Sequence, residues 1–149
     1  MISVQITNGV GLKPVMSSGL RRKGKSKPEL MTNYDFTQGS TGWASNPDVT
    51  FNIKNTTCTI GPPAKGSKAA SISQLVLAGG KTYNVEIDVV AVGLKGTYIV
   101  STDTQLVHTI KNSGINAFSF TAAAKDRLIE LRCSSLTPII INSFSVKGV

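Results

Sequence analysis

Hydrophobic and polar positions alternate along much of this chain, which is the pattern of β-strands that bury one face. The clearest example is residues 83–91, where hydrophobic side chains share one face (Tyr83, Val85, Ile87, Val89) and polar ones the other (Asn84, Glu86, Asp88). Shorter runs predict further strands over residues 51–53, 57–60, 71–77, 97–101, 105–110, 117–121, 128–133 and 139–147. About eight strands at a spacing of roughly ten residues predict an all-β fold, an antiparallel β-sandwich or jelly roll.

A separate strand-like pattern stands at the N-terminus. Ile2, Val4 and Ile6 alternate with polar residues, and the hairpin turn signal Asn8-Gly9 follows them. We interpret residues 1–16 as a strand or small hairpin, and residues 17–28 as a linker too polar to bury itself. The chain therefore divides into an extended N-terminal arm, residues 1–30, and a sandwich domain, residues 31–149.

The positive charge is concentrated in this arm. The whole chain has a net charge of +8, and residues 31–149 contribute +3 from ten basic and seven acidic residues. The arm contributes the other +5, because a single Glu29 opposes six basic residues: Lys13, Arg21, Arg22, Lys23, Lys25 and Lys27.

Three interpretations of the basic segment at residues 21–27 remain open. It neutralises nucleic-acid phosphates, in which case its affinity depends strongly on salt. It lies along an acidic protein surface, or it is a solvated linker without a partner. No aromatic residues are interleaved with the basic ones, so stacking on bases is not indicated.

Length and composition restrict the class of protein. A chain of 149 residues suits one domain with a substantial core. No apolar run approaches the ~20 residues that a membrane helix needs. The first residues also lack the basic and apolar regions of a signal peptide, so we expect synthesis in a cytoplasm and no contact with a membrane.

The two cysteines, Cys58 and Cys133, are expected to be reduced and partly buried, since no export signal indicates an oxidising compartment. A disulfide between them across the sandwich stays open as the alternative. With one histidine in the chain, neither cysteine has the spacing of a zinc site.

The residues needed for catalysis are missing or badly placed. His108 is the only histidine, and we interpret it as a half-buried strand residue on the same side as Leu106 and Ile110. Glu86 and Asp88 lie on the solvent face of one strand, and two acids on one strand do not flank a cleft. The sequence therefore indicates a protein that is not an enzyme and needs no cofactor.

Four motifs resemble carbohydrate-binding-module-like jelly rolls, also described as galactose-binding-like sandwiches. The first is Asn33-Tyr34-Asp35-Phe36 with Gly42-Trp43, similar to the opening strand of those domains and the Gly-Trp pair that follows it. The others are residues 72–77 with 80–83, residues 118–122 and residues 141–146. The resemblance covers residues 31–149 and implies a jelly roll.

The resemblance also suggests site residues. Sugar-binding members stack sugar rings on exposed aromatic residues, which makes Tyr34 and Tyr98 candidate sugar contacts, whereas Trp43 is expected in the core. Many members hold a structural calcium with acidic residues in the first and last strands. Here those positions are Asp35 and Asn142, and the neutral amide implies at most a weak site.

These features lead to two hypotheses about function. The first is a non-catalytic virion protein, made in a host cytoplasm: a bacteriophage head decoration (cement) or other accessory protein, present as a homo-oligomer or symmetric array. Its arm would clasp a major capsid or tail protein, with Ile2, Val4 and Ile6 adding a strand to a partner sheet and the basic residues assisting. The alternative is a carbohydrate-binding module, free or within a phage tail apparatus that recognises a host glycan.

Overall fold

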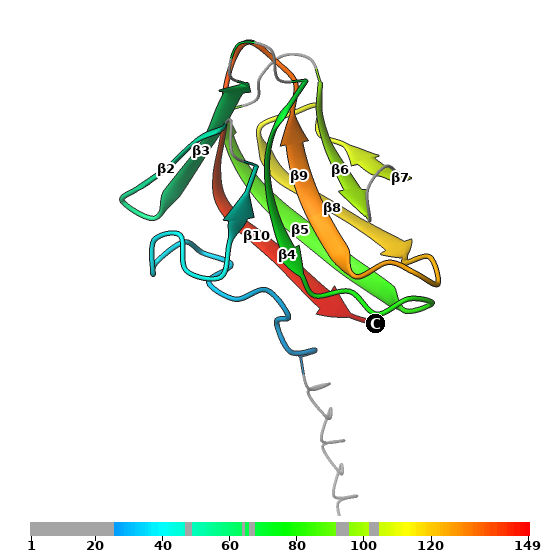
Figure 1. Cartoon of the computed structure of the whole chain (residues 1–149). Helices are drawn as coiled ribbons and strands as arrows, with labels where there is room; N and C mark the ends of the chain where they lie inside the picture. Colours follow the sequence, from blue (N-terminus) through cyan, green and yellow to red (C-terminus); the bar gives the residue numbers. More distant parts are fainter. Residues whose placement is uncertain (1–25, 47–48, 64, 66–67, 92–95, 102–104) are drawn as a thin grey trace, which may run out of the picture.

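A computed structural model describes residues 26–46, 49–63, 65, 68–91, 96–101 and 105–149. The strand or hairpin predicted for residues 1–16 and most of the basic segment lie outside these residues. Within them every regular element is a β-strand, and all the strand pairs are antiparallel (Figure 1). The predicted all-β sandwich is confirmed. No helix in the described part of the chain is long and apolar enough to cross a membrane.

The strands form two five-stranded sheets that lie face to face (Figure 1). Sheet A has the order β2 (Val49–Lys54), β3 (Thr57–Pro63), β10 (Ile139–Gly148), β5 (Thr82–Ala91) and β8 (Gly114–Thr121). Sheet B has the order β1 (Ala44–Ser45), β4 (Ala70–Leu75), β9 (Leu128–Cys133), β6 (Thr97–Ser101) and β7 (Gln105–Thr109).

The core lies between the two sheets and follows the alternation of the sequence. In β5 the four predicted inward residues, from Tyr83 to Val89, are buried, and in β9 Ile129 and Leu131 are fully buried. Trp43 is 9% exposed and packs between Phe36 and Phe144, with ring centroids 5.1 and 5.7 Å away. The expectation that Trp43 belongs to the core is confirmed.

The segment before the sandwich differs from the sequence-based expectation. The strand expected at residues 33–36 is absent, because residues 31–42 form successive turns in which Asn33 and Phe36 have positive φ angles of 53° and 57°. The Asn33 side chain closes these turns: Nδ2 donates to Gly39 O (2.7 Å), and Oδ1 accepts from Gln38 N (2.8 Å). Such local side-chain bonds offer the backbone an alternative to a sheet ladder.

Glu29 fastens the start of the described chain to sheet A. It forms an isolated bridge with Lys147, and its Oε1 accepts the backbone N–H of Val146 at 2.9 Å. Its other carboxylate oxygen accepts a hydrogen bond from Ser145 Oγ. The chain therefore enters the domain alongside β10.

Candidate functional site

The outer face of sheet B carries the side chains that alternate with those facing the core, although Ser71, Glu130 and Val100 among them are themselves buried. Strand register places them in two parallel rows across the sheet. One row runs Ser71, Arg132, Tyr98 and Thr109; the other runs Ser73, Glu130, Val100 and Leu106. The face therefore combines an aromatic ring, an aliphatic floor, two charged groups and several hydroxyls.

Two adjoining hollows open on this face. The first, of about 390 Å³, lies between Asn46, Ser71 and Lys68 on one side and Tyr98, Glu130 and Arg132 on the other. The second, of about 280 Å³, is lined by Tyr98, Val100, Leu106, Thr109 and Arg132. Tyr98 and Arg132 line both, so one extended ligand in contact with this pair would reach both hollows.

Arg132 and Glu130 form a fixed ion pair at the centre of the face. Nη2 of Arg132 lies 2.8 Å from Oε2 of Glu130, which is only 9% exposed. The hydrogen bond and charge of Glu130 raise the pKa of Arg132, against the effect of burial, and Tyr98 contributes in the same direction. The planar guanidinium is therefore held in place before any ligand arrives.

Asn46 builds the rim of the first hollow. Its Nδ2 donates to Ala69 O at 2.8 Å, and its Oδ1 accepts from Ser71 N at 2.9 Å. The amide thus bonds both to Ser71 of β4 and to Ala69 just before that strand. Asn46 therefore extends the sheet edge beyond the two-residue strand β1 and shapes the hollow.

The two tyrosines predicted as sugar contacts lie far apart in the fold: Tyr98 is in β6 of sheet B, and Tyr34 is in the turns of residues 31–42. Tyr98 lies on the outer face of sheet B, half-buried and at the junction of the hollows. Tyr34 is 41% exposed, and its carbonyl accepts a hydrogen bond of 2.8 Å from Phe144 N in sheet A. The structure thus gives Tyr98 a ligand-sized surface and leaves Tyr34 away from it.

Asp35 and Asn142, expected to form a weak calcium site, are each engaged elsewhere. Oδ1 of Asp35 accepts from the backbone N–H and hydroxyl of Thr37, at 3.3 and 2.9 Å. Asn142 donates from Nδ2 to Asp88 (2.9 Å). Calcium takes six to eight oxygen ligands, roughly, and one carboxylate with an already bonded amide is a poor set for it. The described residues also contain no group of three or more His, Cys, Asp or Glu suited to a metal.

His108 is half-buried and on the side of the buried Ile110, as predicted, but it does not share that side with Leu106. A register shift in the β6–β7 pairing places His108 opposite Ile99, on the inner side, and Leu106 opposite Val100, on the outer side. The bulge arises because Val107 is an extra residue between the two pairs. The His108 ring stacks on Phe118 of β8, with centroids 4.2 Å apart and planes at 9°.

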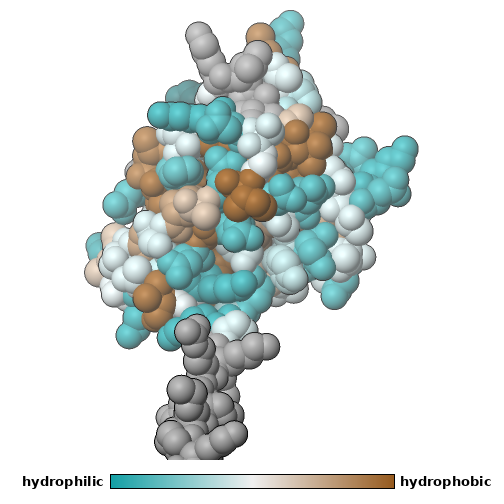
Figure 2. All heavy atoms as spheres, turned by 180° about the vertical axis from the view of Figure 1, so that it is seen from behind, coloured by the Kyte–Doolittle hydropathy of each residue, from teal (hydrophilic) through white to brown (hydrophobic). Residues whose placement is uncertain are grey.

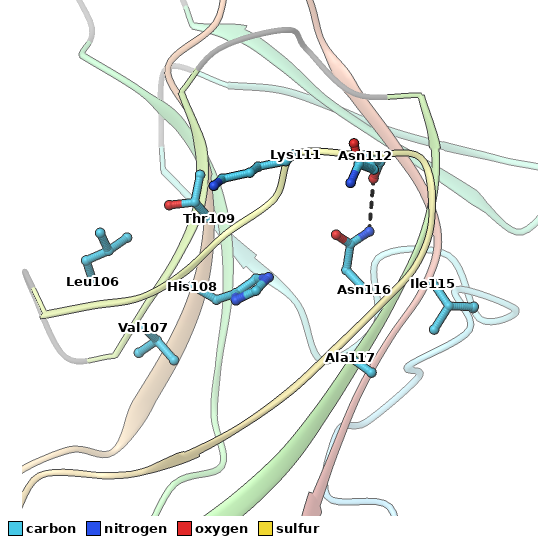
Figure 3. A pocket seen from close by; sticks show the side chains of 9 residues that line it. All are labelled: Leu106, Val107, His108, Thr109, Lys111, Asn112, Ile115, Asn116 and Ala117. Carbon is cyan, nitrogen blue, oxygen red and sulfur yellow. Dashed lines mark hydrogen bonds between the residues drawn. The ribbon is translucent and has the colours of Figure 1, made fainter.

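A groove of about 610 Å³ separates β7 from β8 beside this stack (Figure 3). His108 extends into it from β7, whereas the side chain of Lys111, in the turn that joins the two strands, runs back toward Thr109 (Figure 3). No pattern within the sequence predicts this groove, because it results from the packing of two edge strands in different sheets.

The predicted solvent face of β5 is confirmed. Glu86 is exposed and Asp88 is partly exposed on the outer side of sheet A. Figure 2 views that side of the molecule, where hydrophilic and hydrophobic residues are intermixed. A hollow of about 290 Å³ on this face is lined by Glu86 but not by Asp88, so the two acids do not flank it together.

Both cysteines are free thiols in the core, as expected for the reduced state. Cys58 lies on β3 of sheet A and Cys133 on β9 of sheet B. Burial raises the pKa of Cys58 to about 12, so this thiol is protonated and unreactive at neutral pH.

The arm residues predicted to bind a partner lie outside the described residues, apart from Lys27, whose side chain is exposed. Their role stays a prediction. Conversely, the sequence interpretation missed Arg132, Glu130 and Asn46. For Glu130 and Arg132 the sequence contained a usable signal: opposite charges two residues apart in a strand lie on the same face.

A scan against models of protein families and a search of curated proteins found no match. Solved structures do match. A variant of a family 29 carbohydrate-binding module has a TM-score of 0.56 and 12% identity, over 83% of this chain and 91% of that one. Another variant of a family 29 module, complexed with cellulohexaose, has a TM-score of 0.54 and 13% identity over 83% and 90%.

A third match is the enzymatically active domain of tailspike protein 4 from bacteriophage CBA120. It has a TM-score of 0.51 and 12% identity, over 81% of this chain but only 21% of that one. At these identities the likenesses concern the fold. The chain has the two-sheet jelly-roll fold of carbohydrate-binding modules, and the fold expected from the sequence motifs is confirmed.

Proposed function

We propose that this chain is a non-catalytic carbohydrate-binding module whose glycan lies across the outer face of sheet B. The observation that carries the proposal is the pair of hollows that meet at Tyr98 and Arg132. The fold likeness to family 29 modules, one of them complexed with cellulohexaose, supports the same function.

The chemistry of the face suits a saccharide. The C–H face of a sugar ring packs on an aromatic ring or an aliphatic side chain, which Tyr98 and the exposed Leu106 offer here. Sugar hydroxyls both donate and accept hydrogen bonds, and the fixed Arg132–Glu130 pair offers donors and acceptors at set positions. Because the pair is already ordered, little side-chain entropy is lost when the ligand binds.

A glycan array followed by calorimetry tests the proposal. Cellulohexaose belongs in the array, because a family 29 module was complexed with it. For the tightest oligosaccharide, Tyr98→Ala should weaken binding by roughly tenfold, which corresponds to about 1.4 kcal/mol. Tyr34→Ala is the matched control, because it removes an exposed tyrosine from the turns of residues 31–42, outside the two hollows. Equal losses in both variants, or no glycan bound at all, would contradict the proposal.

A virion accessory role is the second candidate. The shared fold of a phage tailspike segment supports a place in a tail apparatus more directly than one on a capsid. The basic arm supports attachment to a neighbouring subunit through Arg21, Arg22, Lys23 and Lys25.

Co-sedimentation with phage particles from the source tests this second role. The full chain should sediment in fixed proportion to the particle, and replacement of the four basic arm residues by Gln should abolish this without changing glycan affinity. A chain that never associates with particles would remove the virion role and leave the glycan proposal untouched.

A further inference from the structure

β8 is an edge strand that lacks the usual protection against further pairing. Among the described residues it pairs only with β5, in unbroken register from Gly114 to Thr121. An edge strand presents a row of unpaired N–H and C=O groups, and proteins normally blunt such an edge with charges, proline or a bulge. The sequence of β8 has no charged residue and no proline, and its pairing with β5 has no bulge. This edge can therefore accept another strand.

The inner face of β8 is also incompletely covered. Asn116, Phe118 and Phe120 point to the same side as the core residues of β5, yet each is only half-buried. The inward side chains of β5, by contrast, are at most 4% exposed. His108 of β7 stacks on Phe118, with ring centroids 4.2 Å apart, but the groove of about 610 Å³ between the two strands stays open (Figure 3). Aromatic surface that belongs to the core is thus left on this side of the sandwich.

The N-terminal arm contains a segment of matching pattern. Residues 2–7 have β-branched aliphatic side chains on one face (Ile2, Val4, Ile6) and polar ones on the other (Ser3, Gln5, Thr7). In a strand of this pattern placed beside β8, the aliphatic face meets Phe118 and Phe120, and the polar face continues the outward hydroxyls of Ser119 and Thr121. Pairs of aromatic with β-branched residues, and of hydroxyl residues with one another, are favourable across neighbouring strands.

The arm is long enough to reach this edge of its own domain. Glu29 bridges to Lys147 of β10, and the register across sheet A continues from Lys147 to Asn84 of β5 and Ser119 of β8. At the ordinary strand spacing, a strand added beyond β8 lies roughly 20 Å from Glu29. A connection as long as residues 8–28 averages about 25 Å between its ends as a random chain. This match gives the arm an effective concentration of about millimolar, which favours its own domain over a second copy.

We propose that residues 2–7 add to the free edge of β8 in the same molecule, as a further strand of sheet A that covers Phe118 and Phe120. The inference goes beyond the proposed function, because it involves neither a glycan nor the hollows of sheet B. It gives the alternation at the N-terminus an acceptor within the chain, whereas the virion hypothesis places that acceptor on another protein.

Hydrogen exchange of the β8 amides in the full chain tests the proposal. Alternate N–H groups of an edge strand point away from its neighbour and exchange quickly, whereas an added strand protects them. These groups should be protected in the natural chain and exchange about tenfold faster in Val4→Asp, because a carboxylate is not buried against Phe118 and Phe120 without a large cost. Gln5→Asp is the matched control: it adds the same charge on the polar face and should keep the protection.

Two further readouts accompany the exchange rates. The imidazole signals of His108 are unambiguous, because it is the only histidine, and they report on the Phe118 ring on which it stacks. They should shift in Val4→Asp and stay unchanged in Gln5→Asp. The natural chain should sediment as a monomer, since the segment pairs within its own molecule.

Three results would overturn the proposal. The first is fast exchange of the outward β8 amides in the natural chain, or equal exchange in the two variants. The second is a dimer of the natural chain that dissociates in Val4→Asp, which would place the segment on a second copy. The third is a dimer that persists in Val4→Asp with protected β8 amides, which would show that two β8 edges pair with each other.

Discussion

At the scale of single residues, Asn33 organises the segment that leads into the sandwich. Its side chain bonds to Gly39 O and Gln38 N, and its carbonyl accepts the indole N–H of Trp43 at 3.0 Å. A positive φ is tolerated by asparagine more readily than by most residues. One residue thus connects the turns of residues 31–42 to the aromatic core.

Replacing Asn33 with Ala should lower the free energy of unfolding by about 2–4 kcal/mol, because it breaks buried hydrogen bonds and puts alanine at a positive φ. Chemical denaturation of the variant measures this. Asn52→Ala, at an exposed position of β2, is the control and should change stability by less than about 0.5 kcal/mol. Equal effects at the two sites would show that the Asn33 bonds do not hold the turns.

Cys58 gives a pH dependence with a definite sign. Its pKa in the folded state is raised to about 12, from an ordinary value of 9.0. The folded chain therefore keeps a proton that the unfolded chain releases, so the stability from this thiol is full below pH 9 and decreases between pH 9 and 12.

We expect the stability advantage of the natural chain over Cys58→Ala to fall by up to about 1.4 kcal/mol per pH unit above pH 9. Denaturation curves at pH 8, 9 and 10, roughly the start of this window, measure the difference. A difference that stays constant across these values would mean that the thiol is not shielded from solvent in the folded state.

At the scale of elements, the strands were predictable wherever the alternation is strict. Residues 83–91 became β5, and residues 128–133 became β9 with identical bounds. The sequence could not reveal the turns at residues 31–42, which depend on side-chain bonds of Asn33, nor the bulge that turns Leu106 outward and His108 inward. A single extra residue reverses the side assignment of everything before it.

The candidate site was only partly predictable for the same reason. Tyr98 could be named from the sequence as an aromatic residue on a predicted strand. Arg132 and Asn46 line the hollows only because of the strand order. In sheet B, β9 lies between β4 and β6, although these three strands are far apart in the sequence. Strand order is a property of the whole sandwich that alternation within one strand does not contain.

The attachment of the chain to β10 through Glu29 is the element-scale contact most open to test. Its carboxylate accepts hydrogen bonds from Leu30 N, Met31 N and Val146 N, at 3.0, 2.9 and 2.9 Å. Glu29→Ala should cost about 1–3 kcal/mol of stability, since partly buried donors lose a charged acceptor. Glu86→Ala, on the exposed face of β5, is the control and should be close to neutral. Equal losses of stability in the two variants would show that Glu29 does not attach this segment to β10.

At the scale of the whole molecule, the two outer faces have different characters. The outer face of sheet A mixes hydrophilic and hydrophobic residues (Figure 2), and it has a single hollow of about 290 Å³ among those described, beside Glu86. That of sheet B holds the adjoining hollows around Tyr98 and Arg132. A binding protein with this fold therefore has one face better suited to an extended saccharide.

Arg132→Lys separates binding from folding on that face. Lysine keeps the charge but loses the planar fork, so glycan affinity should fall by roughly tenfold while stability changes by less than about 1 kcal/mol. Calorimetric titration and thermal unfolding of the same sample measure both. Arg127→Lys, at an exposed position outside the hollows, should preserve the affinity. An unchanged affinity in Arg132→Lys would exclude the guanidinium from recognition.

The most direct measurement is the change in backbone amide signals of the labelled full chain during titration with its tightest oligosaccharide. We expect the largest changes in β4, β9 and β6, centred on Ser71, Arg132 and Tyr98. Changes centred on Glu86 and Ser145 of sheet A would contradict glycan binding by sheet B.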